Sequence, residues 1–246
     1  INSADSIKLL LDCDKLISVV IPKSVEFLGE SAFDRCDKLE SVIFLDSPAT
    51  ISDYTFSACQ SLRTVDLGNG VKSIGKYAFG GKIESIYIPA SVKNIGYCSF
   101  TSWSMTSIIV DEASTEYSND EYGVLFNKDK TILVQYPLGS TRTEYTVPDG
   151  VETIAKSAFS VAKNLATVKL PDTLTSIEDN AFTFCWELTS IEMPDSVKNV
   201  GDCVFSGCQS LEKVKISSGI RAISVSMFAG CAFTEVIIPE GIEEIG

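Results

Sequence analysis

The hydrophobic positions of this chain follow a short repeated pattern in which apolar and polar residues alternate. The pattern reads L-x-x-V-x-I, and clear copies occupy residues 39–44, 62–67, 188–193 and 211–216. Alternation with a period of two predicts a β-strand whose Val and Ile point inward while the residue between them faces solvent. The leading apolar residue recurs every 21 to 23 residues, at Leu16, Leu39, Leu62, Ile83 and Met105 and again at Leu165, Leu188, Leu211 and Phe233.

Each repeat has a second half with a different spacing, V-x-x-I-G-x-x-A-F-x-x-C. Its Phe recurs at positions 33, 56, 79, 100, 159, 182, 205 and 228. Because a unit of this length cannot bury its apolar residues alone, we expect successive units to stack and share one core. The spacing of the second half is typical of a short helical or 3₁₀ turn. The sequence therefore predicts an α/β repeat solenoid with one parallel β-sheet and short helical or 3₁₀ turns on the opposite side.

One interruption breaks the regular spacing. Phe100 and Phe159 are 59 residues apart, and residues 111–143 hold the surplus. Within this segment, the strand-like runs 123–126 and 131–136 are joined by Asn-Lys-Asp-Lys, which predicts an inserted β-hairpin. We therefore expect residues 1–246 to form a single solenoid with a hairpin insertion at about 111–143.

The full motif, L-x-x-V-x-I-P-x-S-V-x-x-I-G-x-x-A-F-x-x-C, resembles the repeat of the BspA-like leucine-rich-repeat proteins. Complete copies lie around Phe33, Phe182 and Phe205, and the run Gly-Val-Leu-Phe-Asn-Lys-Asp-Lys at 123–130 is also similar to one in that family. Leu45 and Gly68 depart from the motif at the Pro position. The resemblance implies a right-handed leucine-rich-repeat superhelix, export, display on a bacterial cell surface, adhesion to host proteins or neighbouring cells, and no cofactor.

Charge and hydropathy narrow the range of partners. The formal net charge is −13 and the 20 basic residues are scattered, so nucleic acid is excluded as a partner. The longest apolar runs, such as 19–21, are far shorter than a membrane-spanning helix requires. The chain begins at Ile1 without Met or a signal peptide and ends at Gly246 within a repeat motif. These ends predict a fragment of a longer chain whose export signal lies elsewhere.

The chain contains no histidine, which removes the usual base for a Ser or Cys nucleophile and the commonest zinc ligand. No C-x-x-C pair is present to bind zinc through cysteine alone. Acidic residues of the insert could gather calcium, but their spacing fits no known calcium loop, so a solvated acidic flank is the favoured interpretation. These residues are Asp111, Glu112, Glu116, Asp120 and Glu121. The sequence therefore predicts neither catalysis nor a metal or other cofactor.

Most of the eight cysteines recur at equivalent positions of successive repeats. Stacked repeats lie about 4.8 Å apart, and parallel side chains would keep their Cβ atoms near that distance, beyond the ~3.8 Å that a disulfide prefers. We therefore expect buried thiols that act as small hydrophobic residues and as weak donors to turn carbonyls.

Candidate binding residues come from the outward positions of the strands. Apolar side chains occupy this position in the first half of the chain, and Ile43, Tyr87 and Ile109 form the predicted protein-binding patch. The alternative is that β-branched residues simply suit exposed strands. Trp103 and Trp186 occupy an equivalent position of the repeat, just after the Cys position. One interpretation is that an exposed Trp there stacks on a sugar or anchors a partner, and the other is that it packs over the adjacent repeat.

The function predicted from these observations is a non-catalytic binding or adhesion module of an exported bacterial surface protein. Its ligand is a protein or a glycan on host or neighbouring cells, and the chain is a monomer. Two alternatives remain. One is a structural spacer that carries another domain, and the other is a polysaccharide-acting β-helix enzyme using carboxylates, although the strand-facing acids Asp66 and Glu192 lie several repeats apart.

Overall fold

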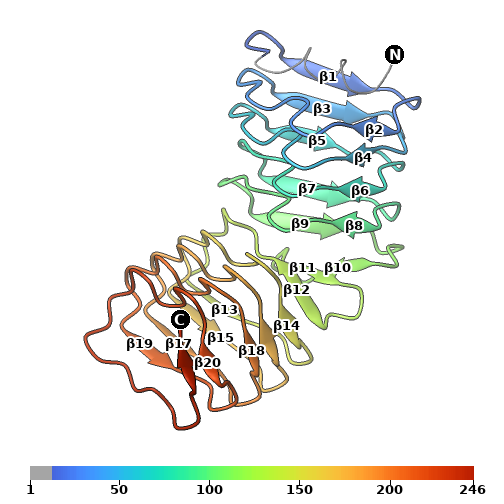
Figure 1. Cartoon of the computed structure of the whole chain (residues 1–246). Coiled ribbons are helices and arrows are strands. Elements are labelled where there is room, and N and C mark those ends of the chain that lie inside the picture. Colours follow the sequence, from blue (N-terminus) through green and yellow to red (C-terminus); the bar gives the residue numbers. More distant parts are fainter. Residues whose placement is uncertain (1–12) are drawn as a thin grey trace. The chain divides into compact units, whose positions relative to one another are not determined.

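The computed structural model describes residues 13–246 and divides the chain into two compact units, Ile1–Lys128 and Asp129–Gly246. Each unit is a stack of coils, and the stacked strands are visible in Figure 1. One strand of each coil joins a main sheet, built from the V-x-I segments. A second strand, of two residues in most coils, joins a narrow sheet and includes the Ile of the I-G step, as in β6 (Ser73–Ile74). The chain start at Ile1, which contributed to the prediction of a fragment, lies outside the described residues.

The first unit shows the predicted alternation in its main-sheet strands. In β7, for example, Ile86 and Ile88 are buried while Ser85 and Tyr87 are exposed. The strands run parallel and in register in two hydrogen-bonded groups, β1-β3-β5 and β7-β9, which we treat together as the main sheet of this unit. Their bounds are β1 (Ser18–Ile21), β3 (Ser41–Phe44), β5 (Thr64–Asp66), β7 (Ser85–Ile88) and β9 (Ser107–Val110).

The narrow sheet of the first unit is also parallel, in the order β2-β4-β6-β8. In β4 and β6 the second residue is a buried Ile, and the first is only partly covered. The strands are β2 (Phe27–Leu28), β4 (Thr50–Ile51), β6 (Ser73–Ile74) and β8 (Asn94–Ile95).

The second unit repeats this arrangement. Its main sheet has the order β13-β15-β17-β19, and its narrow strands β12, β14, β16 and β18 are parallel neighbours. A final parallel pair, β20 and β21, aligns Ile223 with Ile245. The bounds are β12 (Ile132–Gln135), β13 (Glu144–Thr146), β14 (Thr153–Ile154), β15 (Thr167–Lys169), β16 (Ser176–Ile177), β17 (Ser190–Glu192), β18 (Asn199–Val200), β19 (Lys213–Lys215), β20 (Ala222–Ile223) and β21 (Glu244–Ile245).

Two parts of the predicted architecture are wrong. Each unit has a second sheet in addition to the main one, and residues 13–246 contain no helical turn. The physical reason lies two residues before each stacked Phe, where the backbone adopts a left-handed φ of 50–60° in all eight coils. A left-handed residue interrupts the right-handed backbone that a helix requires. The Phe N–H then bonds to the next coil, as in Phe33 to the carbonyl of Thr55 at 2.8 Å.

Within each unit, the second halves of the coils place their Phe side chains in a stack, which we call the Phe ladder. In the first unit, the rings of Phe33 and Phe56 lie 4.9 Å apart and only 10° from parallel. In the second unit, Phe182 lies 4.8 Å from Phe159 and 5.3 Å from Phe205. The predicted stacking of equivalent residues is confirmed within each unit.

Both strand-like runs predicted in the insert form strands, β11 (Leu125–Asn127) and β12, and a further strand pairs antiparallel with the first of them. This further strand is β10 (Tyr117–Asn119), which pairs with β11 in the first unit. The second predicted strand also forms, as β12, and runs parallel to β14 in the second unit. Tyr136 follows β12 and stacks on Phe159 at 5.2 Å, so it occupies a position of the Phe ladder. The stacked coils of the second unit therefore begin inside the segment that the spacing assigned to the insert.

Candidate binding surfaces

The outward face of the main sheet in the first unit carries a row of side chains in strand register. Val20 is aligned with Ile43, which is aligned with Asp66, and Tyr87 is aligned with Ile109. Tyr87 and Ile109 are 49% and 44% exposed, whereas Ile43 is half-buried. The structure brings Tyr87 and Ile109 together. It separates Ile43 from them by the strand that carries Asp66.

The Tyr87 hydroxyl interacts with the carboxylate of Asp111, and this interaction raises the pKa of Tyr87. The pKa of Asp111 is lowered, first by the N–H of Ala113 and second by the hydroxyl of Tyr87. Tyr87 therefore presents an exposed ring beside Ile109. An exposed aromatic side chain is well suited to anchor a partner.

The two tryptophans lie in different surroundings. Trp103, in the first unit, is 53% exposed. Trp186, in the second unit, is half-buried and lines an open hollow of about 600 Å³ together with residues of two preceding segments, 141–143 and 163–166. The shared sequence slot therefore gives one exposed ring and one ring that forms the wall of a hollow.

The main sheet of the second unit presents charged side chains. Its outward row runs through Thr146, Lys169, Glu192 and Lys215, and the last two are register partners. A hollow of about 420 Å³ lies over these strands. Lys215 is 3.5 Å from the carboxylate of Asp195, an exposed pair that contributes little to stability.

Sequence reasoning missed two further groups of surface aromatic residues. Tyr54 and Tyr77 stack at 5.3 Å, and Tyr97 meets Tyr77 edge-on at 5.5 Å. Tyr54 and Tyr77 occupy the left-handed position two residues before the ladder Phe. Phe184, which is 47% exposed, also has a left-handed φ of 59°. For Tyr54 and Tyr77, the only signal in the sequence was an aromatic residue at a position where other coils have Ser, Asn or Cys.

None of the eight cysteines forms a disulfide, as predicted, but four of them are only half-buried: Cys13, Cys98, Cys203 and Cys231. Four of the eight donate Sγ–H to the Phe carbonyl of the preceding coil at 3.1–3.2 Å: Cys59, Cys185, Cys208 and Cys231. Burial raises the pKa of Cys59 and that of Cys231 to about 12. A thiol with so high a pKa is a poor nucleophile, because the reactive form is the thiolate.

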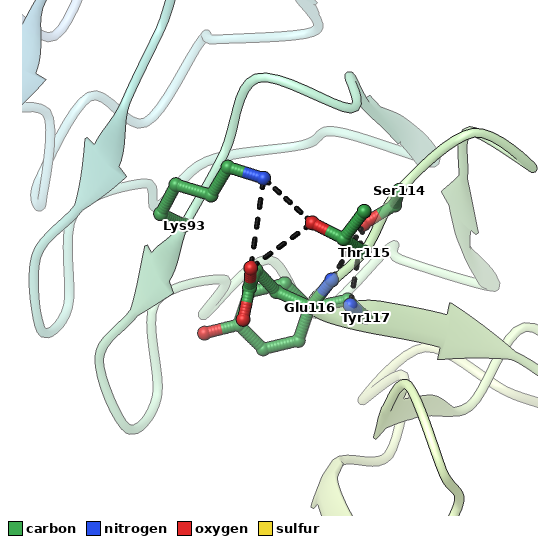
Figure 2. Close-up of polar contacts among 5 residues, drawn as sticks. All are labelled: Lys93, Ser114, Thr115, Glu116 and Tyr117. Carbon is green, nitrogen blue, oxygen red and sulfur yellow. Dashed lines mark hydrogen bonds and ion pairs between the residues drawn. The ribbon is translucent and has the colours of Figure 1, made fainter.

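The acidic residues of the insert hold its own turns and its contact with the preceding coil. One oxygen of Asp120 accepts the N–H groups of Tyr122 and Val124, both at 2.9 Å. Glu116 lies 3.5 Å from Lys93, and Lys93 also donates to the Thr115 hydroxyl at 2.7 Å (Figure 2). Within residues 13–246, no three carboxylates or thiols come together as metal ligands. The same part of the chain contains no helix that could cross a membrane.

The repeat pattern and the stacked fold agree with a known protein family. The family model described as the BspA type leucine rich repeat region matches six copies, over residues 8–122 and 139–246. This chain belongs to the BspA-type leucine-rich-repeat family. The matches leave out residues 123–138, which include β11 and β12. A search of curated proteins finds no significant match to this BspA-type chain.

Solved structures share the fold of this BspA-type protein. A leucine-rich repeat protein from Eubacterium ventriosum has 24% identity and a TM-score of 0.73, with 95% of this chain and 67% of that chain covered. A leucine rich cell surface protein from Faecalibacterium prausnitzii has 24% identity and a TM-score of 0.59, with 95% and 80% covered. The pneumococcal vaccine antigen PcpA has 22% identity and a TM-score of 0.59, with 93% and 73% covered. The family and these neighbours are repeat proteins, and the likeness establishes the fold.

Proposed function

We propose that this BspA-type chain is a non-catalytic adhesion module of an exported bacterial surface protein, and that it binds a protein through the main-sheet face of the first unit. The observation that carries the proposal is the pair Tyr87 and Ile109, which are register partners with nearly half of each side chain exposed. Exposed apolar side chains that lie together are typical of an interface. Membership of the family and the cell-surface description of one structural neighbour support the location.

The proposal contains no chemical step. The chain has no histidine, and the two strand-facing acids that a polysaccharide-acting enzyme would need, Asp66 and Glu192, belong to different units. Binding by a preorganised surface loses little conformational entropy, so several modest contacts suffice for affinity. We propose a monomer that presents this surface to host proteins or neighbouring cells.

The test uses the double variant Tyr87→Ala/Ile109→Ala and a panel of immobilised purified extracellular-matrix proteins. We expect the wild-type chain to bind at least one member, and the double variant to lose about tenfold or more in affinity, the range seen when central anchors are truncated. Both side chains are largely outside the core, so the free energy of unfolding should change little.

The matched control is Glu192→Ala/Lys215→Ala, which alters the same outward row in the second unit. It should bind like wild type. Equal binding by the Tyr87/Ile109 variant and wild type would remove this surface from consideration. Failure of the wild-type chain to bind any protein of the panel would favour the structural spacer.

A further inference from the structure

The hollow beside Trp186 combines an aromatic wall with a ring of polar groups. Its wall includes the half-buried Trp186, and its polar residues come from three successive segments of the second unit: Thr141, Thr143, Lys163, Asn164 and Glu187. Its volume of about 600 Å³ falls within the range of small-molecule sites. We propose that this hollow is a saccharide-binding site for a neutral sugar ring.

The polar groups offer both donors and acceptors. The Asn164 side chain donates from Nδ2 to the Ser140 carbonyl at 2.7 Å, which fixes the amide and leaves its carbonyl oxygen as an acceptor. Glu187 is exposed and adds a carboxylate, while Lys163 adds an ammonium donor. The two threonine hydroxyls are exposed and both donate and accept. A sugar requires this mixture, because each of its hydroxyls is at once a donor and an acceptor.

The aromatic wall suits the apolar face of a sugar ring. A pyranose ring has a face of C–H groups that packs against a flat aromatic ring, and an indole supplies the largest such surface among side chains. A partly buried indole is held in place, so the ligand does not have to order it on binding. In the neighbouring coils of the second unit the equivalent slot holds Lys163 and Gln209. The aromatic wall is therefore a local feature of this coil.

Charge favours a neutral ligand over an acidic one. Lys163 and Glu187 contribute one charge of each sign to the hollow, so their sum is zero. The chain as a whole carries a formal charge of −13, which repels sialylated or sulfated sugars over longer distances. This site lies in the second unit and shares no residue with the Tyr87 and Ile109 surface, so the two proposals succeed or fail separately.

The experiment exploits the fact that the chain has only two tryptophans. In the variant Trp103→Phe, all tryptophan fluorescence comes from Trp186. We titrate this variant with neutral oligosaccharides that end in glucose, galactose, mannose or N-acetylglucosamine. We expect a saturable change in emission with at least one of them, together with at least twofold protection from acrylamide quenching. Their sialylated counterparts should bind at least tenfold more weakly.

The matched variant Trp186→Phe leaves only Trp103 and keeps an aromatic ring in the hollow. It should show no emission change from Trp103, and calorimetry should report weakened binding. Asn164→Ala and Glu187→Ala should each weaken binding at least fivefold, with circular dichroism unchanged. The proposal is overturned if no neutral oligosaccharide alters Trp186 emission, if Trp103 reports the same change, or if sialylated sugars bind more tightly. The proposal is also overturned if binding is lost only in variants that unfold, because the loss would then reflect unfolding and not the removal of contacts in the hollow.

Discussion

At the scale of single residues, the buried cysteines show how a side chain joins one coil to the next. Cys59 is fully buried, and its Sγ donates to the Phe33 carbonyl at 3.1 Å. A thiol suits this position because it is compact, apolar and still able to satisfy a turn carbonyl. Deprotonation would remove the donor and bury a charge, so the neutral thiol is part of the folded structure.

The pKa of Cys59 leads to a prediction for alkaline solution. Burial raises its pKa from 9.0 to about 12, so the unfolded chain loses this proton at lower pH than the folded chain does. The stabilisation is complete below pH 9 and is lost as the pH rises toward 12. We expect the free energy of unfolding to fall over this window, by at most about 1.4 kcal/mol per pH unit from this thiol.

The measurement is guanidinium unfolding of wild type and Cys59→Ser between pH 7 and 11. The serine keeps a hydroxyl donor but does not titrate in this range. The difference in free energy between the two proteins should shrink or reverse as the pH rises. A constant difference would mean that Cys59 does not titrate with a raised pKa.

The thiol positions could be predicted from the sequence because they follow from coil spacing and disulfide geometry alone. The left-handed residues could not. At that position the eight coils carry Ser, Tyr, Cys or Asn, and only Asn commonly adopts such a backbone conformation. The conformation is imposed by hydrogen bonds to the next coil, as in Tyr54 N–H to the Lys76 carbonyl at 2.9 Å. The conformational preference of a single residue does not reveal a hydrogen bond to a neighbouring coil, so these left-handed positions could not be predicted.

At the scale of elements, the Phe ladder is the main packing device. Phe182 is fully buried between Phe159 and Phe205, whereas Phe228 is only half-buried and has one ladder neighbour, Phe205 at 5.7 Å. We expect Phe182→Ala to cost about 3–5 kcal/mol of stability, as for other large core truncations, and Phe228→Ala to cost clearly less. Chemical denaturation of both variants measures this.

Hydrogen exchange adds a spatial readout to the same comparison. Because each coil contacts only its neighbours, the loss of protection in Phe182→Ala should be greatest in the coils of Phe159 and Phe205 and weaker at Ile223. If the two variants lose the same free energy of unfolding, the cost of removing a ladder Phe does not depend on whether it has ladder neighbours on both sides.

A side chain of the insert accepts a backbone hydrogen bond from the preceding coil, where a neighbouring strand would otherwise do so. The N–H of Ile95 in β8 donates to the Tyr117 hydroxyl at 2.8 Å. Tyr117→Phe removes this acceptor from a half-buried donor and should cost about 0.5–1.5 kcal/mol, the usual net contribution of one hydrogen bond. Lys93→Ala breaks the exposed pair with Glu116 shown in Figure 2 and should cost less than about 1 kcal/mol.

Amide exchange at Ile95 distinguishes these two changes. Protection should fall in Tyr117→Phe and persist in Lys93→Ala. If Ile95 remains fully protected without the hydroxyl, another group must accept its N–H, and the insert would be held in some other way.

The main-sheet strands could be predicted from sequence because V-x-I alternation records which face is buried, and Ile86 and Ile88 bear this out. The narrow sheet could not, because a strand of two residues shows no period. The spacing of the repeats also predicted that Tyr87 and Ile109 face outward on successive strands. In the same order of outward residues, Asp66 stands between Ile43 and this pair.

At the scale of the whole molecule, charge governs the response to acid. The formal charge is −13 at pH 7 and reaches zero near pH 4.5. Acidification toward that point relieves repulsion among the 33 acidic residues, which favours the folded state. Specific carboxylates act in the opposite direction, because several accept backbone N–H groups from the next coil, as Asp46 does from Asn69 at 3.0 Å and Asp195 does from Ser218 at 3.1 Å.

These two effects predict a maximum of stability between about pH 4.5 and 5. The pKa of Asp195 is lowered, chiefly by the N–H of Ser218, so its contribution is present above its ordinary value of 3.8 and is lost as the pH falls through the folded value. The pKa of Asp46 is lowered in the same way by the N–H of Asn69. Unfolding measured from pH 7 to pH 2 should show stability rising slightly at first and then falling below pH 4. The double variant Asp46→Asn/Asp195→Asn keeps both acceptors without their titration, so its decline below pH 4 should be shallower. Parallel curves for the two proteins would mean that general repulsion among the basic groups, and not these two bonds between coils, limits stability in acid.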